Sequence, residues 1–196
     1  MSELAPEERA RADFYGLLAR LFYAPADRAL LEALASMGAL PSDDASAALA
    51  LAWRELSQAA SAVSEDAARD EYEALFVGTG KAEVSLYTTA YTIKSAIDNP
   101  LVEIRDFMDR HGLVRKESTF EPEDHIAALC EIMRIIVATQ QASMPEQTRF
   151  FRSYIGPGGI LLCDAIYRNT KAVFYRHVAR LARTFIELEQ DAFEIH

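Results

Sequence analysis

Apolar residues recur along most of this chain at the spacing of amphipathic helices. Near the start, Phe14, Leu17 and Leu21 fall on one helical face. The strongest run follows position 122, where apolar side chains recur at i, i+3, i+4, i+7 and i+11. Its members are Ile126, Leu129, Cys130, Met133 and Val137. The pattern predicts an all-α helical bundle. The expected helices span about 6–22, 27–37, 43–61, 64–76, 100–112, 122–141 and 145–154, with two more after a glycine-rich break at 156–159.

The stretch 77–98 is the least regular part of the chain, with glycines, hydroxyl side chains and two tyrosines. Part of it, 84–91, can adopt an extended conformation. Loops held by a rigid scaffold often carry function, so we treat 77–98 as a functional loop. No domain boundary stands out, which predicts a single domain over 1–196, with a possible hinge at 114–121.

The composition of the chain indicates which classes of partner it can bind. Its 196 residues are 51% hydrophobic and carry a formal net charge of −10. An acidic surface repels a phosphate backbone, which argues against nucleic acid, and attracts a basic peptide. An ordinary solubilising surface charge fits the same numbers.

The cysteines and the apolar runs indicate a cytoplasmic protein. Cys130 and Cys163 lie on apolar helical faces without a Cys-x-x-Cys pairing, so we expect buried, reduced thiols. The charged first residues do not resemble a signal peptide. No apolar run approaches the ~20 residues of a membrane span, so we expect no stable membrane insertion.

The segment from Phe120 to His125 carries the most specific signal. Pro122 suits the first position of a helix, and Glu123 and Asp124 suit the positive end of its dipole. We expect His125 in the same first turn, and Asp124 exposed on the side opposite the apolar face. A well-started core helix explains these residues as well as a binding site does.

Two further motifs precede this segment. An aromatic-x-x-Leu-Phe-x-Gly motif ends the helix expected at 64–76, and a Tyr-x-Thr-x-Tyr motif lies in the loop after it. The residues of these motifs are Tyr72, Leu75, Phe76 and Gly78, then Tyr87, Thr89 and Tyr91. With Glu-Pro-x-Asp-His at 121–125, their order and separation resemble the TorD/DmsD/NarJ-like family of redox-enzyme maturation chaperones. The resemblance extends from Phe14 to the last helix.

The chain departs from the family pattern at three places. Thr89 stands where the family has serine, and prolines that often precede the tyrosine motif are missing from 81–85. A Pro-Trp pair near the penultimate helix is replaced by Gly-Pro-Gly-Gly at 156–159. These departures bear on which client is bound.

The resemblance implies a single-domain, TorD-like cytoplasmic chaperone that is not an enzyme. Its implied partners are the twin-arginine signal peptide, and the apo form, of a molybdenum-cofactor oxidoreductase subunit, held until cofactor insertion and before export. The implied signal-peptide and client-binding residues are Tyr72, Leu75, Phe76, Tyr87, Tyr91, Glu121, Pro122, Glu123, Asp124 and His125. The loop 77–81 favours a formate-dehydrogenase-type client. The family includes monomers and helix-exchanged dimers.

Two other interpretations stay open. Asp124 and His125 could act as the acid and base of a small-molecule or nucleotide hydrolase, and the chain could be a helical adaptor without a peptide groove. The sequence Gly78-Thr79-Gly80-Lys81 lacks the first glycine and the final hydroxyl of a phosphate loop. No Glu-x-x-His or His-Glu-x-x-His motif indicates a metal site. We therefore expect no cofactor, apart from weak guanine nucleotide binding that the resemblance implies.

Overall fold

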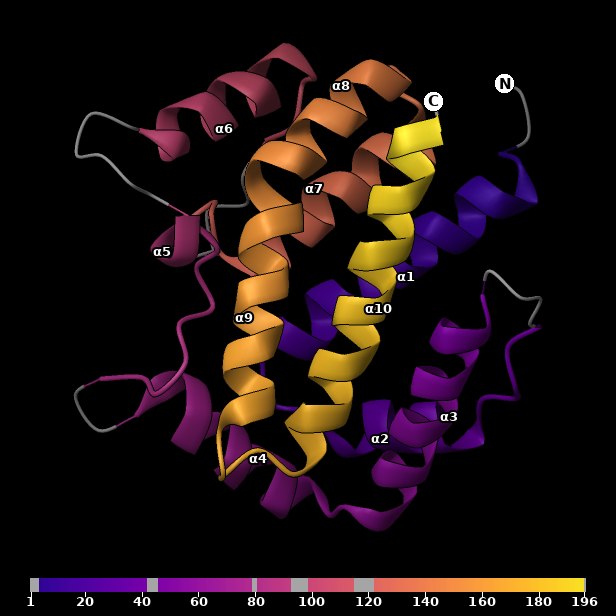
Figure 1. Ribbon diagram of the computed structural model, residues 1–196, viewed down its shortest axis with the longest axis vertical. Helices are drawn as coiled ribbons and strands as arrows, with labels where there is room; N and C mark the ends of the chain where they lie inside the picture. The colour runs from indigo at the N-terminus through magenta and orange to yellow at the C-terminus, as the bar shows by residue number, and fades with distance from the viewer. Residues whose placement is uncertain (1–3, 42–45, 79–80, 93–98, 115–121, 196) are drawn as a thin grey trace. The chain divides into compact units, whose positions relative to one another are not determined.

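The computed structural model describes residues 4–41, 46–78, 81–92, 99–114 and 122–195, and these residues are predominantly helical (Figure 1). The α-helices are α1 (Pro6–Tyr23), α2 (Arg28–Ser36), α3 (Ala47–Ala62), α4 (Glu65–Tyr72), α5 (Thr89–Thr92), α6 (Pro100–Arg110), α7 (Ile126–Thr139), α8 (Met144–Phe150), α9 (Gly156–Arg168) and α10 (Phe174–Ile195). Two π-helices, η1 (Glu73–Val77) and η2 (Phe151–Ile155), extend α4 and α8. The prediction of an all-α fold is confirmed.

The chain divides into two compact units, each assembled from two separate stretches of sequence. The first unit comprises Met1–Tyr23 and Leu86–Gly159, and the second comprises Ala24–Ser85 and Ile160–His196. A single domain over 1–196 stays a prediction. The hinge expected at 114–121 lies, apart from Val114, outside the described residues.

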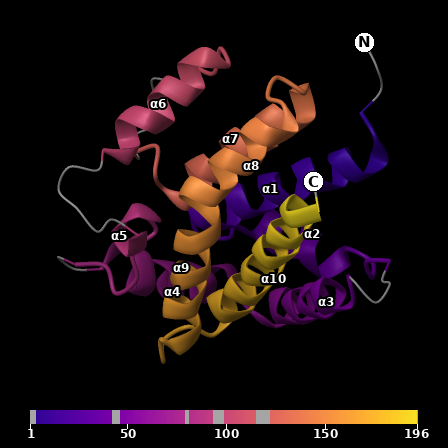
Figure 2. The ribbon, with the colours of Figure 1, turned by 45° about the horizontal axis from the view of Figure 1, so that its top comes forward.

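The first unit is built on the packing of α1 against α7 (Figure 2). Leu18 and Leu21 of α1 and Leu129 and Met133 of α7 are almost wholly buried, as the helical spacing of the sequence predicts. Helix α7 also packs against α8 and η2. The most apolar helix of the sequence is therefore the centre of this unit.

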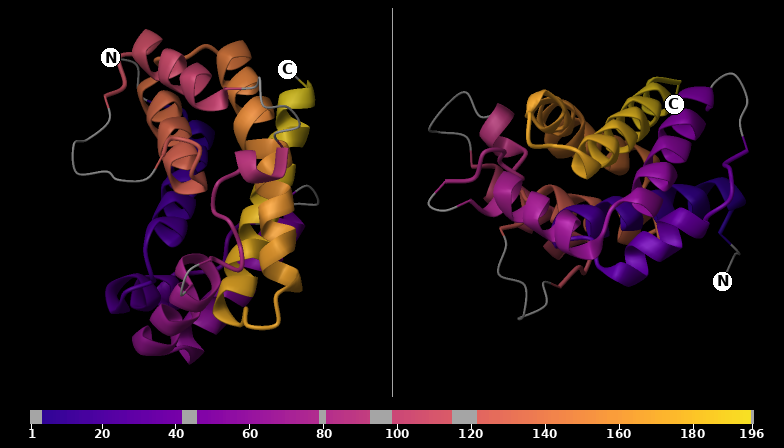
Figure 3. Two further views of the ribbon diagram at one scale, coloured as in Figure 1. Left: turned by 90° about the vertical axis from the view of Figure 1, so that its left-hand side faces the viewer. Right: turned by 90° about the horizontal axis from the view of Figure 1, so that it is seen from below.

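The second unit is built on α10, which packs against α3 and α4. Figure 3 shows α9 and α10 side by side, and an ion pair between Arg183 and Asp164 joins them. The carboxylate of Glu71, on α4, accepts hydrogen bonds from the backbone N–H groups of Val173, Phe174 and Tyr175 at 2.8–2.9 Å. A side chain distant in sequence thus caps α10, whose own sequence supplies no acidic first turn.

Helix α7 begins later than the sequence predicts. Pro122, Glu123 and Asp124 precede the helix, and His125 is its N-cap residue with extended backbone dihedrals. The cause lies elsewhere in the chain: the backbone around His125 pairs with Leu86–Thr88, and this pairing keeps it extended. The prediction that Pro122 occupies the first helical position is wrong.

The break expected at 156–159 is also absent, since the helix continues from α8 through η2 into α9. The N–H of Gly156 bonds to the carbonyl of Phe151, five residues earlier, which is the wider π-helical pattern. Pro157, which has no N–H to donate, follows this wide turn. The π-helical turn allows the helix to continue through the Gly-Pro-Gly-Gly sequence.

Candidate functional site

The first motif forms the π-helix η1 at the end of α4. The N–H of Gly78 closes its last turn by bonding to the carbonyl of Glu73 at 2.8 Å. Gly78 has a φ of +63°, and a Cβ there would lie 2.3 Å from the backbone oxygen of Lys81. The motif needs glycine at this position because no other residue fits the turn.

The aromatic residues of this motif pack on α10. The rings of Tyr72 and Phe76 lie 5.0 Å apart, and both meet Tyr175 edge to face, at 5.6 and 5.2 Å. Leu75 is fully buried, whereas Phe76 is half-buried. Tyr72 and Leu75 therefore belong to the core of the second unit, and Phe76 is the member of the motif with surface left for a partner.

The second and third motifs lie together in the first unit. An isolated antiparallel bridge pairs Tyr87 with His125, closed by bonds from Thr88 N–H to the Asp124 carbonyl at 3.1 Å and from Ile126 N–H to the Leu86 carbonyl at 2.9 Å. The rings of Tyr87 and His125 meet edge to face at 5.4 Å. Residues from both motifs thus form one junction, although they are some 36 positions apart in the sequence.

Asp124 holds this junction together from the inside. The side chain of Thr89 donates a hydrogen bond to its carboxylate, and only 6% of Asp124 is exposed. The sequence predicted an exposed Asp124, and that prediction is wrong. Because Asp124 precedes the helix instead of starting it, its side chain turns toward the tyrosine motif.

Glu123 is buried as well and is paired with α6. Its carboxylate accepts a hydrogen bond from Arg105 at 2.9 Å, and 7% of its side chain is exposed. This hydrogen bond raises the pKa of the Arg105 guanidinium. Pro122 is half-buried beside it, and Glu121 lies outside the described residues. Glu123 therefore meets a cation from its own chain.

His125 caps α7. Its Nδ1 accepts a hydrogen bond from the N–H of Ala127 at 3.2 Å, so the lone pair that a general base would need at this nitrogen is engaged. Asp124, its neighbour in the hydrolase interpretation, is engaged with Thr89. Each of the two side chains has a structural role at the junction.

Sequence reasoning missed the residue that seats the tyrosine motif, Gly158. A Cβ on Gly158 would lie 2.7 Å from both the Cβ and the backbone oxygen of Thr88. The start of α9 therefore contacts the Thr88–Thr89 segment at a distance that only glycine allows. The glycine-rich sequence at 156–159, which we interpreted as a helix break, was the sequence feature that could have indicated this close contact.

Three other features of the described residues bear on function. No group of three His, Cys, Asp or Glu side chains among them has the arrangement of a metal site. None of the described helices is long and apolar enough to cross a membrane. Thr79 and Gly80, at the centre of the phosphate-loop-like sequence, lie outside the described residues.

The fold places the chain among all-α proteins, and sequence comparison identifies its family. The family described as "Nitrate reductase delta subunit" matches residues 42–157, more than half of the chain, and the chain belongs to it. Membership confirms the TorD/DmsD/NarJ-like resemblance seen in the sequence.

Individual relatives agree with this assignment. The chain is 28% identical to the chaperone protein TorD of Aliivibrio salmonicida over 128 residues, which is 58% of each protein. It is 24% identical to DmsD of Haemophilus influenzae, an inferred Tat proofreading chaperone, over 65% of this chain and 61% of DmsD. The matches thus span about three fifths of these relatives' lengths.

A solved structure shows the same fold. A protein of Archaeoglobus fulgidus, proposed to act in redox enzyme maturation, aligns with 95% of this chain and 98% of its own, with a TM-score of 0.60. The two sequences are 16% identical, so the likeness concerns the fold alone.

Proposed function

We propose that this protein is a cytoplasmic chaperone for the maturation of a molybdenum-cofactor oxidoreductase. It binds the twin-arginine signal peptide of the enzyme subunit, and its apo core, until the cofactor is inserted and before export. The observation that carries the proposal is the junction of the second and third motifs, in a chain of the nitrate reductase delta subunit family. The names of the relatives, a TorD chaperone and a Tat proofreading chaperone, support it.

The residues of the junction have different roles in the proposed peptide binding. Tyr87 and Tyr91 are half-buried and offer aromatic surface to the apolar part of a peptide. The backbone bridge from His125 positions Tyr87, and the hydrogen bond between Asp124 and Thr89 positions the segment between the two tyrosines. We therefore assign Asp124 a positioning role, in place of the direct contact with arginine that an exposed carboxylate would make.

The arginine pair of the peptide would meet exposed carboxylates of a protein that carries a net charge of −10. Glu121 remains a predicted member of that set. No reaction by this protein is needed for such holding, and we propose no catalytic residue and no cofactor. A formate-dehydrogenase-type client and the choice between a monomer and a helix-exchanged dimer stay predictions.

Calorimetric titration with a synthetic leader tests the proposal. The peptide carries two adjacent arginines followed by about 12 apolar residues, and a control peptide has alanines in place of the arginines. We expect the arginine peptide to bind, and to bind more weakly as ionic strength rises from about 0.01 to about 0.15 M, which shortens the Debye length from ~30 to ~8 Å. The alanine peptide should bind more weakly and with little dependence on salt.

Two results would count against the proposal. Equal binding of both peptides would show that the protein recognises apolar sequence alone. Absence of binding by either peptide, to a protein whose melting is normal, would remove the signal peptide as a partner.

A further inference from the structure

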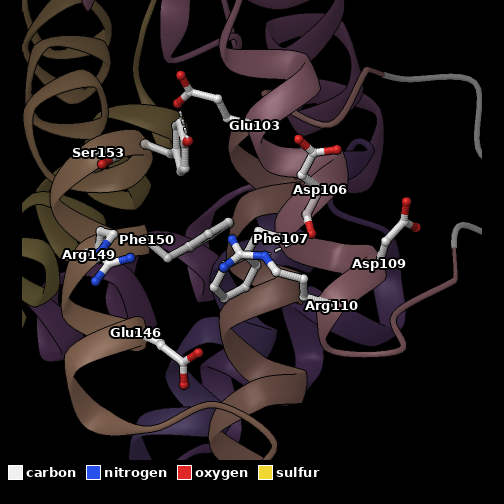
Figure 4. A pocket seen from close by; sticks show the side chains of 10 residues that line it. Glu103, Asp106, Phe107, Asp109, Arg110, Glu146, Arg149, Phe150 and Ser153 are labelled. Atoms are coloured by element: carbon white, nitrogen blue, oxygen red, sulfur yellow. Dashed lines mark hydrogen bonds between the residues drawn. The ribbon is translucent and has the colours of Figure 1, made fainter.

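The first unit contains a cavity that none of the three motifs lines. It lies between α6 and the helix formed by α8 and η2, and has a volume of about 590 Å³ (Figure 4). Sites for small ligands commonly enclose ~300–1,000 Å³. The lining residues are Glu103, Asp106, Phe107, Asp109, Arg110, Glu146, Arg149, Phe150, Ser153 and Tyr154.

Aromatic rings form the floor of this cavity. Phe107 and Phe150 are buried with ring centres 4.6 Å apart, and Tyr154 meets Phe150 edge to face at 5.2 Å. The hydroxyl of Tyr154 donates a hydrogen bond to Glu103 at 2.7 Å, which holds the ring at the cavity wall. Burial, together with this hydrogen bond to a carboxylate, raises the pKa of Tyr154, so the hydroxyl stays neutral. Of the three rings only that of Tyr154 is half-buried, and the buried rings of Phe107 and Phe150 hold it in place.

The rim is predominantly acidic, with four carboxylates and two guanidinium groups. Glu103 is engaged by Tyr154, and Glu146 accepts hydrogen bonds from the N–H and hydroxyl of Ser143. Asp106 and Asp109, both exposed on α6, form no ion pair among the described residues. In Figure 4 their carboxylates lie on the α6 side of the cavity, facing away from the aromatic floor.

The two arginines of the rim come from opposite walls of the cavity. Arg110 donates to the backbone carbonyl of Asp106 at 3.2 Å, and its guanidinium lies 5.8 Å from the ring centre of Phe107. Arg149 comes from the opposite wall, on α8. Arg110, next to Asp109, is thus engaged by backbone and ring, and Arg105, next to Asp106, is paired with Glu123. Both carboxylates are therefore open to a cation from outside.

A buried histidine adds an independent observation behind the floor. The side chain of His111 is 8% exposed, and its Nδ1 bonds to the carbonyl of Gln141 at 3.0 Å. Its Nε2 has no hydrogen-bond partner among the described residues and faces the carboxylate of Glu146, on the cavity wall, at 3.7 Å. Buried polar atoms without a hydrogen bond are uncommon in folded proteins, and this one lies beside a residue of the cavity wall.

We propose that this cavity binds a short peptide segment in which an apolar side chain neighbours an arginine or lysine. The apolar side chain would pack against the half-buried Tyr154, which the buried rings of Phe107 and Phe150 support, and the cation would be held at the rim by Asp106 or Asp109. The inference rests on the proposed function in one respect, because a chaperone for a polypeptide client supplies such segments. It adds a second client site, separate from the junction of the motifs.

Fluorescence anisotropy with a labelled octapeptide of leucine, phenylalanine and arginine tests the site. The first variant, Asp106→Asn with Asp109→Asn, removes the two open carboxylates. A second, Ser153→Trp, fills the cavity from an exposed position on its wall. The matched control, Asp191→Asn with Glu194→Gln, makes the same change of charge at exposed positions of α10.

We expect the aspartate variant to bind about tenfold more weakly, which corresponds to the loss of two exposed charge pairs. Ser153→Trp should abolish binding, and the control should bind like the wild type. Equal weakening in the control would show that net charge alone attracts the peptide, and would overturn the proposal. So would unchanged binding to Ser153→Trp.

The same variants separate this proposal from the proposed function. If the twin-arginine leader fails to bind while the octapeptide binds and responds to the variants, the cavity site stands and the leader function falls. If the leader binds all variants equally and the octapeptide does not bind, the cavity proposal alone is overturned. The wild type could instead self-associate without binding the peptide, and Ser153→Trp could abolish that association. This result would assign the cavity to a second copy of the chain and would also overturn the cavity proposal.

Discussion

At the scale of single residues, the carboxylate of Asp124 decides how the motif at 121–125 is understood. Its position resembles that of an exposed anion at a helix start, yet its burial and its bond from Thr89 make it part of the core. Removing one partner of a buried hydrogen bond leaves the other unsatisfied, which is more costly than losing an exposed charge. We therefore expect Asp124 to contribute to the free energy of unfolding.

Asp124→Ala should therefore lower the free energy of unfolding by about 1–3 kcal/mol, instead of the ~0.5 kcal/mol that suits an exposed dipole interaction. Urea denaturation of Asp124→Ala, Thr89→Val and the double variant measures this, with exposed Asp191→Ala as the control. The double variant should lose less than the sum of the single losses, because the two side chains share one bond. Additive losses would show that they act independently.

A second residue-scale prediction concerns Gly158. In Gly158→Ala the new methyl group would approach Thr88 to 2.7 Å, so the start of α9 and the tyrosine motif must move apart. We expect a loss of about 1–3 kcal/mol, as for overpacking in a core. Gly38→Ala is the matched control, since a Cβ at Gly38 meets no atom within 4 Å. Equal melting temperatures for the two variants would refute the close contact.

At the scale of elements, the sequence predicted most helices because their signals are local. Ser64 caps α4 through a bond from the N–H of Ala67, and Pro100 begins α6, as capping rules anticipate. The start of α7 was misplaced because its determinant, the pairing of His125 with Tyr87, is not local. The burial of Asp124 escaped prediction for the same reason.

The capping of α10 by Glu71 gives a prediction at this scale. Glu71→Ala leaves the N–H groups of Val173, Phe174 and Tyr175 without their acceptor. Loss of a helix cap typically costs ~0.5–2 kcal/mol, and we expect about 1–2 kcal/mol here because one side chain serves three donors. Thermal unfolding of Glu71→Ala should show this loss, and exposed Glu73→Ala, two positions away, should melt like the wild type.

The first turn of α8 should give the stability a dependence on pH. Hydrogen bonds from Ser143 lower the pKa of Glu146 from its usual 4.5, so the folded state binds a proton less readily than the unfolded state. The contribution of Glu146 is thus present above pH 4.5 and is lost as pH falls through the lowered pKa. In denaturation between pH 6 and 3 (roughly the range where carboxylates titrate), Glu146→Gln should lose stability less steeply than the wild type. Parallel curves would show that the hydrogen bonds from Ser143 to Glu146 do not form in solution.

At the scale of the whole molecule, the sequence identified the fold class and the family, but only part of the site. The three motifs were legible because each combines unusual residue types in a fixed order. That two of them meet at one junction, and that Tyr72 and Leu75 are core residues, depends on tertiary packing that periodicity does not report. The acidic cavity between α6 and α8 carries no motif, because its residues are ordinary for exposed helix faces.

The most direct test of the account is recovery of the client from cells. The tagged full-length protein, expressed from its native chromosomal locus and purified gently, is analysed by mass spectrometry for bound polypeptides. We predict a molybdenum-cofactor oxidoreductase subunit that still carries its uncleaved twin-arginine leader, enriched when molybdenum is withheld. Recovery of only the mature, leader-free enzyme, or of no oxidoreductase under either condition, would contradict the account.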